Sequence, residues 1–486
     1  MMKIENIISL LKPLQVIESK ATSFKNIHFD SRKVEKDDLF VAIKGSISDG
    51  HIYIDDVCKK AVSVIVCEEI PKNPSELVYW IKVENSAKAL ALISTAFYDF
   101  PSEKIKLIGV IGTNGKTTIA TSLYNLTTKL GYKTGLISTV RNIIGTQAVE
   151  ATHTTPDALS LNKILAQMVE QSCEFCFMEV SSHAIHQHRT TGLNFDGGVF
   201  TNITHEHLDY HNTFDEYIKV KKSFFDNLSK IAFAITNIDD RNGEVMLQNS
   251  KAQKFSYAVL RSADYKTKIL ETHFNGMLLN IDNTEVWTNF VGNFNASNLT
   301  AIYATAINLG FSKEEVLTGI SALQLVDGRF QTINSEDGIT AIVDYAHTPD
   351  AIENVLKTIN EIRKVGEKLF TVVGAGGNRD KAKRPEMAQI AAKLSDRLIL
   401  TSDNPRNENP EDILKDMEAG LDFQLKAKTI KITDRKEAIR TACMMAERGD
   451  VILIAGKGHE TYQEIKGVKH HFDDREIVSE ILKQIS

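Results

Sequence analysis

The feature that most constrains this chain is an apolar segment, Lys106–Ile111, that runs directly into a glycine-containing loop. The loop reads Gly112-Thr113-Asn114-Gly115-Lys116-Thr117-Thr118, and a helical pattern follows it as far as Leu130. A strand, a loop and a helix in this order predict a phosphate-binding loop, because backbone N–H groups at a helix N-terminus attract anions. The Lys116 ammonium would reach the terminal phosphates of ATP, and the Thr117 hydroxyl would ligate Mg²⁺.

The loop departs from the general phosphate-loop pattern at one position. That pattern has a glycine five residues before Gly115, where this chain has Val110. A tight turn that merely uses two glycines is therefore an alternative interpretation. The apolar strand before the loop and the helical pattern after it, with Gly131 as a C-terminal cap, favour ATP binding.

Beyond residue 329 the chain alternates strand-like and helical segments. The expected strands are 340–343, Leu369–Val373, Arg397–Leu400 and 451–454, and the polar loops that follow them are 344–347, 374–380, 403–406 and 456–460. Such alternation predicts a parallel sheet, in which ligands bind at the carboxyl ends of the strands. Ordinary solvated turns would explain any one of these loops, but four at equivalent positions indicate one site.

Composition narrows the classes of function. At about 150 residues per domain, 486 residues predict roughly three domains. The formal net charge of -6 provides no positive field for a nucleic-acid backbone, so anionic ligands must be held by local groups. Earlier strands are expected at 39–43, 61–67, Phe175–Val180 and 197–203.

The five cysteines indicate a reducing compartment rather than a disulfide framework. Cys173 and Cys176 form a C-x-x-C pair in an apolar run, without a second pair to complete a zinc site, so we expect buried, unreactive thiols. The N-terminus lacks the pattern of a signal peptide, and no apolar stretch approaches 18 residues. The sequence therefore predicts a cytoplasmic protein without a membrane span.

These motifs resemble those of the Mur ligases, the ATP-dependent amide-forming enzymes of peptidoglycan precursor synthesis. Beside the shortened phosphate loop, the resemblance rests on Asp30-Ser31-Arg32, Thr154-Thr155-Pro156, 178–189, 201–211, Gly292-Asn293-Phe294-Asn295, 343–350, 376–385, 403–406 and 456–460. It is strongest to the members that add the third peptide residue to UDP-N-acetylmuramoyl-L-alanyl-D-glutamate.

The resemblance implies an α/β fold with the three-domain Mur ligase architecture. A UDP-binding domain would span 1–103, and a central P-loop-type parallel-sheet domain for ATP and magnesium would span 104–328. A C-terminal Rossmann-like domain at 329–486 would bind the amino acid. All the implied partners are small molecules: ATP, the UDP-muramoyl-dipeptide and the amino acid. We expect neither a nucleic-acid partner nor an obligatory oligomer, so the chain is predicted to act as a monomer.

A cluster of histidines and acids between His205 and His211 suggests either zinc or magnesium. A phosphate loop needs a hard cation, and Thr117 and Glu179 supply oxygen ligands, so magnesium is favoured. The resemblance implies two Mg²⁺ ions and adds His207 and a carbamate on Lys221 as ligands, with His205 and His211 outside the ligand set. Lys116, Glu179, His207 and Lys221 would then be the catalytic residues.

The choice of Lys221 among its neighbouring lysines depends on spacing. Family members carry the modified lysine four residues after a tyrosine and just before an aromatic or aliphatic pair, and Tyr217 and Phe224-Phe225 match that pattern. Carbon dioxide would convert the neutral amine into an anionic oxygen ligand. Without the resemblance, a solvated basic face would be the usual interpretation of Lys219, Lys221 and Lys222.

The resemblance also assigns residues to the two nucleotide substrates. The uridine end would contact Phe29, Ser31, Ser46, Ile47 and Ser48, although a simple turn also explains 46–50. The muramoyl-dipeptide would contact Thr154, Thr155, Ser181, Gln187 and Arg189, beside His153, which replaces the asparagine often found there. ATP would contact the phosphate loop together with Asn295, Arg329, Asp344 and His347.

The loop Asp403-Asn404-Pro405-Arg406 bears on the amino acid that is added. In the family this motif marks the members that add meso-diaminopimelate, and Arg379, Gly456 and Glu460 match the remaining contacts. A guanidinium such as that of Arg406 can bind the distal carboxylate of diaminopimelate through two hydrogen bonds, which L-lysine cannot offer. The alternatives are lysine addition, a folylpolyglutamate synthase, and a P-loop ATPase that catalyses no ligation.

Overall fold

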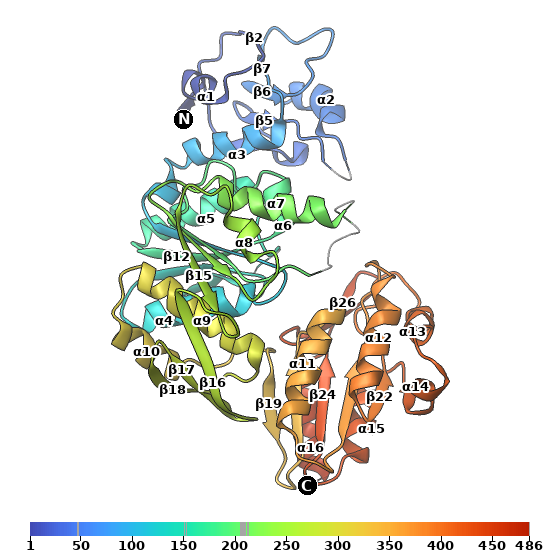
Figure 1. Ribbon diagram of the computed structural model, residues 1–486. Coiled ribbons are helices and arrows are strands. Elements are labelled where there is room, and N and C mark those ends of the chain that lie inside the picture. The colour runs from blue at the N-terminus through green and yellow to red at the C-terminus, as the bar shows by residue number, and fades with distance from the viewer. Residues whose placement is uncertain (46–47, 150, 152, 205–209, 211–212, 486) are drawn as a thin grey trace.

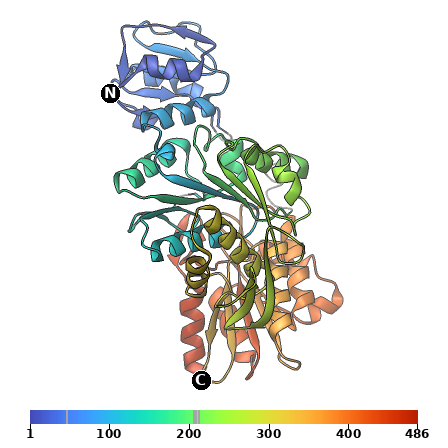
Figure 2. The same cartoon turned by 60° about the vertical axis from the view of Figure 1, so that its left-hand side comes forward.

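The computed structural model describes residues 1–45, 48–149, 151, 153–204, 210 and 213–485. The described chain forms α/β domains that follow one another along the molecule (Figure 1). Figure 2 shows the same row from another side, with the two ends of the chain again at opposite ends of the molecule. Of the predicted site residues, Ser46, Ile47 and His207 lie outside the described residues, as do His205 and His211.

The N-terminal domain is built on a sheet with the order β2-β7-β6-β5-β4. Its strands are β2 (Gln15–Ile17), β4 (Ile27–His28), β5 (Leu39–Val41), β6 (Val64–Cys67) and β7 (Tyr79–Lys82), and β1 (Met2–Lys3) pairs separately with β3 (Ser23–Phe24). The helices are α1 (Ile4–Leu11), α2 (Ile54–Cys58) and α3 (Ser86–Phe97), with the short 3₁₀ turns η1 (Ser31–Lys33), η2 (Gly50–Tyr53) and η3 (Pro101–Glu103). The strands predicted at 39–43 and 61–67 are present but shorter.

The central domain has the strand order β11-β10-β9-β12-β8-β13-β14-β15-β16-β17-β18. The strands are β8 (Lys106–Ile111), β9 (Thr134–Ile137), β10 (Asn142–Ile144), β11 (Gln147–Val149), β12 (Phe175–Val180), β13 (Gly197–Phe200), β14 (Phe233–Asn237), β15 (Gln253–Ala258), β16 (Tyr265–His273), β17 (Gly276–Ile281) and β18 (Thr284–Thr288). The predicted strand 197–203 therefore ends earlier, at Phe200.

The central sheet is parallel only from β9 to β16. At its edges β10 and β11 pair antiparallel, as do β16, β17 and β18, so the prediction of a parallel sheet was incomplete. Asp282 and Asn283 connect β17 to β18 with φ of 49° and 62°. Two consecutive residues with positive φ suit the tight turn of an antiparallel hairpin.

The central sheet is covered by helices on both faces because β8 is apolar on both sides. Ile108 and Val110 pack with α4 (Lys116–Lys129) and α9 (Asn293–Asn308), whereas Leu107 and Ile111 pack with α5 (Ala158–Glu170) and α7 (Phe214–Asp226). The alternation of side chains along a strand produces this division. The remaining helices of the domain are α6 (Ser182–His186), α8 (Gly243–Leu247) and α10 (Lys313–Ser321).

The C-terminal domain has the strand order β19-β20-β24-β21-β22-β23, with β19 antiparallel and the other strands parallel. The strands are β19 (Gln331–Asn334), β20 (Thr340–Asp344), β21 (Leu369–Val373), β22 (Arg397–Leu400), β23 (Thr429–Lys431) and β24 (Val451–Ala455), and the hairpin is β25 (Tyr462–Ile465) with β26 (Val468–His471). The helices are α11 (Pro349–Ile362), α12 (Lys383–Leu394), α13 (Pro410–Glu418), α14 (Phe423–Ala427), α15 (Arg435–Met445) and α16 (Asp474–Ile485). The four strands predicted here are present, and their polar loops lie at one edge of the sheet.

Burial explains the unreactive character expected of the cysteines. All five are free thiols, and Cys67, Cys173, Cys176 and Cys443 are buried. Burial raises the pKa of Cys67 and of Cys443 to about 12 in each case, so these thiols stay protonated at neutral pH. Among the described residues, no helix is both long and apolar enough to cross a membrane.

Candidate active site

The phosphate loop is held between the ends of two adjacent strands, β8 and β13. The backbone N–H groups of Thr113 and Asn114 donate to the carbonyl and side-chain oxygens of Asn202, at 2.8 and 2.9 Å. A Cβ atom at Gly112 would lie 1.8 Å from the Thr201 hydroxyl, so this close approach requires glycine. The sequence after β13 therefore sets the shape of the loop.

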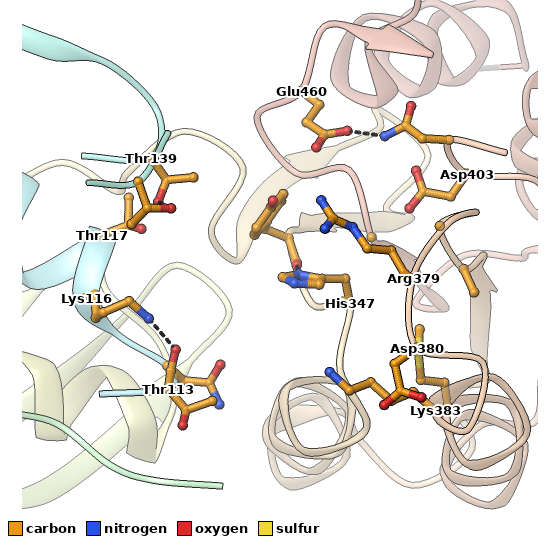
Figure 3. A pocket seen from close by; sticks show the side chains of 18 of the residues that line it. Thr113, Lys116, Thr117, Thr139, His347, Arg379, Asp380, Lys383, Asp403 and Glu460 are labelled. Carbon is orange, nitrogen blue, oxygen red and sulfur yellow. Dashed lines mark hydrogen bonds between the residues drawn. The ribbon is translucent and has the colours of Figure 1, made fainter. Parts of the chain in front are cut away.

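Gly115 is the N-cap residue of α4; it has a φ of 87° and provides no side-chain cap. The first N–H groups of α4 consequently depend on other acceptors, and a bound phosphate would supply them. Lys116 follows at once, and its ammonium donates to the carbonyl oxygens of Gly112 and Thr113 at 3.0 and 2.7 Å (Figure 3). Lys116 also lines a cavity of about 330 Å³ next to the loop.

Glu179 lies almost fully buried at the end of β12, next to β8. Its carboxylate accepts a hydrogen bond from the Thr139 N–H at 2.8 Å, and the Thr139 hydroxyl lies 3.2 Å from its second oxygen. Thr117 and Glu179 line the same cavity of about 330 Å³, together with Thr139. The hydroxyl and carboxylate oxygens fit a hard cation such as Mg²⁺. No cluster of three or more His, Cys, Asp or Glu residues within the described part of the chain is arranged as a metal site.

Lys221 lies on α7 and is 1% exposed, which is unusual for a lysine. Its ammonium nitrogen lies 4.6 Å from the centre of the Tyr217 ring. The Tyr217 hydroxyl in turn lies 3.2 Å from the Thr113 hydroxyl, which connects α7 to the phosphate loop. Burial beside that loop argues against the alternative of a solvated basic face for this lysine.

The residues predicted for the muramoyl-dipeptide form a connected group beside Glu179. The Thr155 hydroxyl donates to the Glu179 carbonyl at 2.8 Å and accepts from the Ser181 N–H at 3.1 Å. Arg189 donates to the Thr155 carbonyl at 2.7 Å and to the Gln187 side chain at 2.6 Å. Thr154 and Ser181 themselves line the 330 Å³ cavity.

A second cavity, of about 450 Å³, also borders the phosphate loop. The predicted ATP residues that line it are Asn295, Arg329, Asp344 and His347, together with Asn114, Gly115 and Thr118. Arg329 and His347 also line the first cavity, so the two cavities share part of their wall. Asn295 thus lines one cavity and the predicted metal ligands Thr117 and Glu179 line the other, and the phosphate loop borders both.

Arg329 stands where the C-terminal domain meets the phosphate loop. Its guanidinium lies 3.4 Å from the Thr117 hydroxyl and 4.6 Å from the centre of the Tyr345 ring. Asp344 accepts hydrogen bonds from the N–H groups of Phe330 and Ala346 at 2.6 and 2.7 Å. Burial raises the pKa of Asp344, while the charge of Arg329 opposes that shift.

The predicted amino-acid residues line the first cavity from its other side. These are Arg379, Asp403, Asn404, Arg406, Gly456 and Glu460, and Figure 3 shows several of them facing Lys116 and Thr117. Arg406 donates to the Gly377 carbonyl at 2.7 Å, and Asn404 donates to Glu460 at 2.7 Å. Pro405 contributes its backbone carbonyl, which lies against Gly377.

The described uridine residues lie in the N-terminal domain and line neither cavity. Phe29 is 37% exposed, Ser31 begins η1, and Ser48 lies near Tyr53 with 3.5 Å between the two hydroxyls. Asp30 caps η1 and pairs with Arg32, which lowers the pKa of Asp30 to about 2. The structure thus leaves these residues in another domain from the phosphate loop.

Several residues of the site were not predicted from the sequence. Thr139 donates to Glu179, and the Tyr345 ring lies under the Arg329 guanidinium. The Asn298 side chain lies so close to Gly115 that a Cβ atom there would be 2.5 Å from it. Arg384 is buried and binds Glu408 and the Gly376 carbonyl, which supports the loop that carries Arg379. Tyr345 lies inside the family-like segment 343–350 and could have been predicted from it, whereas Thr139 and Asn298 lie in no recognised motif.

The fold and this site together define a three-domain ATP-dependent α/β ligase. The Mur ligase family catalytic domain matches residues 23–98, the Mur ligase middle domain matches 110–306, and the Mur ligase glutamate ligase domain matches 328–458. The chain belongs to the Mur ligase family.

Two relatives are alike over nearly their full length. The UDP-N-acetylmuramoyl-L-alanyl-D-glutamate--2,6-diaminopimelate ligase of Bacteroides fragilis is 53% identical, with 99% of both chains covered. The enzyme of the same name from Cytophaga hutchinsonii is 55% identical, also with 99% of both chains covered. A solved structure with that name is 30% identical, has a TM-score of 0.69, and matches 100% of this chain and 99% of its own.

More distant structures share the fold alone. The MurF ligase of Thermotoga maritima in complex with ADP is 18% identical, with a TM-score of 0.62 and coverage of 95% of this chain and 99% of its own. The folylpolyglutamate synthase of the same organism is 15% identical and matches 76% of this chain and 90% of its own, with a TM-score of 0.58.

Proposed function

We propose that this chain catalyses the ATP-dependent addition of meso-2,6-diaminopimelate to UDP-N-acetylmuramoyl-L-alanyl-D-glutamate. The observation that carries the proposal is the 330 Å³ cavity, in which Lys116, Thr117 and Glu179 face Arg379, Arg406 and Glu460. A phosphate loop and a pocket with groups for both an ammonium and a carboxylate thus share one space. The full-length relatives named for this reaction support the choice of substrates.

The reaction would begin at the side-chain carboxylate of the D-glutamyl residue. A carboxylate oxygen attacks the γ-phosphorus of ATP, the bond from that phosphorus to the bridging oxygen breaks, and ADP leaves with an acyl phosphate formed. Lys116 and Arg329, which both line this cavity, would neutralise charge on the transferred group. The substrate carboxylate would be oriented by Thr154, Thr155, Ser181, Gln187 and Arg189.

The amino group of diaminopimelate then attacks the acyl carbon. The amine loses a proton, inorganic phosphate leaves, and an amide remains. Arg379 and Arg406 would bind the distal carboxylate, and Glu460 would bind the distal ammonium. Because these groups lie in the cavity that contains the phosphate loop, the amine can reach the acyl phosphate before water does.

Magnesium fits the oxygen donors in this cavity. Thr117 and Glu179, with Lys221 as a carbamate and His207, would hold the predicted two ions. When bound, these ions would neutralise the phosphate oxygens of ATP. Asn295 would contact adenine, and Asp344 and His347 would complete the ATP pocket.

The nucleotide substrates and the buried thiols support a cytoplasmic location. One chain carries residues for all three substrates, which supports action as a monomer. We also propose that the domains divide at residues 103/104 and 328/329.

The test combines a panel of amino acids with product identification by mass. Phosphate release should require both the UDP-muramoyl-dipeptide and meso-diaminopimelate, and L-lysine should be at least about a hundredfold poorer, because it offers Arg379 and Arg406 no distal carboxylate. Arg406→Ala should lose most of this preference. Equal turnover of both amino acids would favour lysine addition, and phosphate release without either substrate would favour a non-ligating ATPase.

A further inference from the structure

A fully buried lysine lies directly behind the amino-acid side of the cavity. Lys457 is 0% exposed, although it lies in the loop between β24 and β25. Its ammonium lies 3.1 Å from the side-chain oxygen of Asn404, 3.2 Å from Glu460 and 3.5 Å from Asp403. Those three residues line the cavity, whereas Lys457 is absent from the described lining. The cation therefore acts on the pocket through its neighbours.

Lys457 and the Glu464 N–H together fix which end of the Asn404 amide faces Glu460. The Asn404 oxygen accepts from Lys457 and also from the Glu464 N–H at 2.9 Å. Since a backbone N–H is always a donor, this contact identifies the oxygen end of the amide. The amide nitrogen is therefore directed to Glu460, 2.7 Å away.

Glu460 is oriented by the same contacts. A single carboxylate oxygen, Oε2, accepts from both Asn404 and Lys457. The hydrogen-bonding capacity of the other oxygen, Oε1, is not used in these two contacts and remains for a ligand. Glu460 can therefore receive one ammonium while its other oxygen stays anchored.

The charge of Lys457 also balances the wall of the pocket. Asp403 and Glu460 each bring a carboxylate, and Lys457 lies within 3.5 Å of both. With Lys457 in place this group carries one net negative charge, which matches one ammonium. Without it, the group would carry two negative charges, and the other buried cation that acts on Asp403 and Glu460, Arg435, already pairs with Asp474 at 2.7 Å.

We propose that Lys457 is a positioning residue that makes this pocket selective for a distal carboxylate beside a distal ammonium. Diaminopimelate and L-lysine share the ammonium and differ only in that carboxylate. An added negative charge in the wall repels the carboxylate, and the Asn404 oxygen keeps only its contact with the Glu464 N–H, so the amide is held less firmly. Loss of Lys457 therefore penalises diaminopimelate more than L-lysine. This inference rests on the proposed function.

The test compares two substitutions of different chemistry. Lys457→Met removes both the charge and the hydrogen bonds, whereas Lys457→Gln removes the charge but keeps an N–H donor for Asn404. Lys469→Met is the matched control. Both lysines lie near the Tyr462 ring, Lys469 at 4.1 Å and Lys457 at 5.7 Å from its centre, but Lys469 is exposed on β26. For each variant, kcat and KM are measured with both amino acids, and KM with ATP and the UDP substrate.

We expect the kcat/KM ratio of diaminopimelate to L-lysine to fall by at least about tenfold in Lys457→Met, mainly through KM for diaminopimelate. Lys457→Gln should show most of this change, and Lys469→Met none. KM for ATP should stay within about twofold in all variants, since the phosphate loop is untouched. An unchanged ratio in both Lys457 variants, or equal losses with both amino acids, would overturn the inference. Wild-type enzyme without diaminopimelate activity would instead overturn the proposed function.

Discussion

At the residue scale, the fold buries two lysines for which we propose roles at this site. Lys221 and Lys457 are 1% and 0% exposed, although lysine is among the residues least often buried. Lys457 is surrounded by carboxylates, which explains how its charge is accommodated. Lys221 is the residue predicted to carry the metal-binding carbamate. It lies beside the Tyr217 ring, and the Tyr217 hydroxyl contacts the phosphate loop.

The carbamate predicted on Lys221 can be tested directly. Lys221→Ala should be almost inactive, because the pocket would lose an anionic oxygen ligand, and a short carboxylic acid that fills the gap should restore part of the activity. In the wild-type protein, ¹³CO₂ should give a carbamate carbon signal in NMR spectra. Lys222→Ala is the control, since Lys222 pairs with Asp226 at 2.7 Å on the same helix. Full activity in buffer freed of CO₂ would contradict the assignment.

The sequence indicated several residues that line the cavity, but not the residues that hold them in place. Lys116, Thr117 and Glu179 were found because each follows or ends an apolar strand, and parallel strands bring such positions together. Thr139 and Lys457 were missed because they act by holding Glu179, Asn404 and Glu460. Which side chain holds which other one depends on packing, and a single sequence does not encode that in a readable pattern.

At the element scale, the predictable parts were the strands buried on both faces. β8, β12, β21 and β22 were predicted with their observed bounds, because continuous apolar runs end abruptly at polar loops. The antiparallel strands β16 to β18 were not predicted. Only one of the nine residues of β16 is buried, and its sequence lacks a continuous apolar run.

The close approach of two loops gives a prediction at this scale. A Cβ atom at Gly377 would lie 1.9 Å from the Pro405 carbonyl oxygen, so Gly377→Ala must push the loop at 374–380 away from the loop at 403–406. The Arg406 side chain would lose its position, because it donates to the Gly377 carbonyl. We expect KM for diaminopimelate to rise at least about tenfold, consistent with an overpacking cost of about 1–3 kcal/mol.

The control for this change is Gly366→Ala. Gly366 also requires an unusual backbone conformation, with a φ of 97°, but a Cβ atom there would meet nothing within 4 Å. That variant should lower the melting temperature while leaving KM for diaminopimelate unchanged. If both variants changed KM equally, general destabilisation rather than loop displacement would be responsible.

At the scale of the whole molecule, the residues predicted for the different substrates are divided between the domains. The C-terminal domain meets the phosphate loop directly, where Asn114 donates to Asp350 at 2.8 Å. The predicted uridine residues lie instead in the N-terminal domain at the far end of the row (Figure 1). No pattern in the sequence indicates this arrangement, because motifs give the order of the domains and not their mutual placement.

Because the predicted uridine residues lie in their own domain, we expect that binding of the UDP-muramoyl-dipeptide can be weakened without affecting the other substrates. Phe29 is 37% exposed, and an exposed aromatic face can stack on a base, which is worth about 1–3 kcal/mol by alanine substitution. Phe29→Ala should therefore raise KM for the UDP-muramoyl-dipeptide by about tenfold, with KM for ATP and diaminopimelate unchanged. Phe423→Ala is the matched control, because Phe423 is an exposed phenylalanine on α14 of the C-terminal domain. Steady-state kinetics with each substrate varied in turn provide the measurement. Equal effects of Phe29→Ala on KM for all three substrates would show that the N-terminal domain does not act as a separate binding unit.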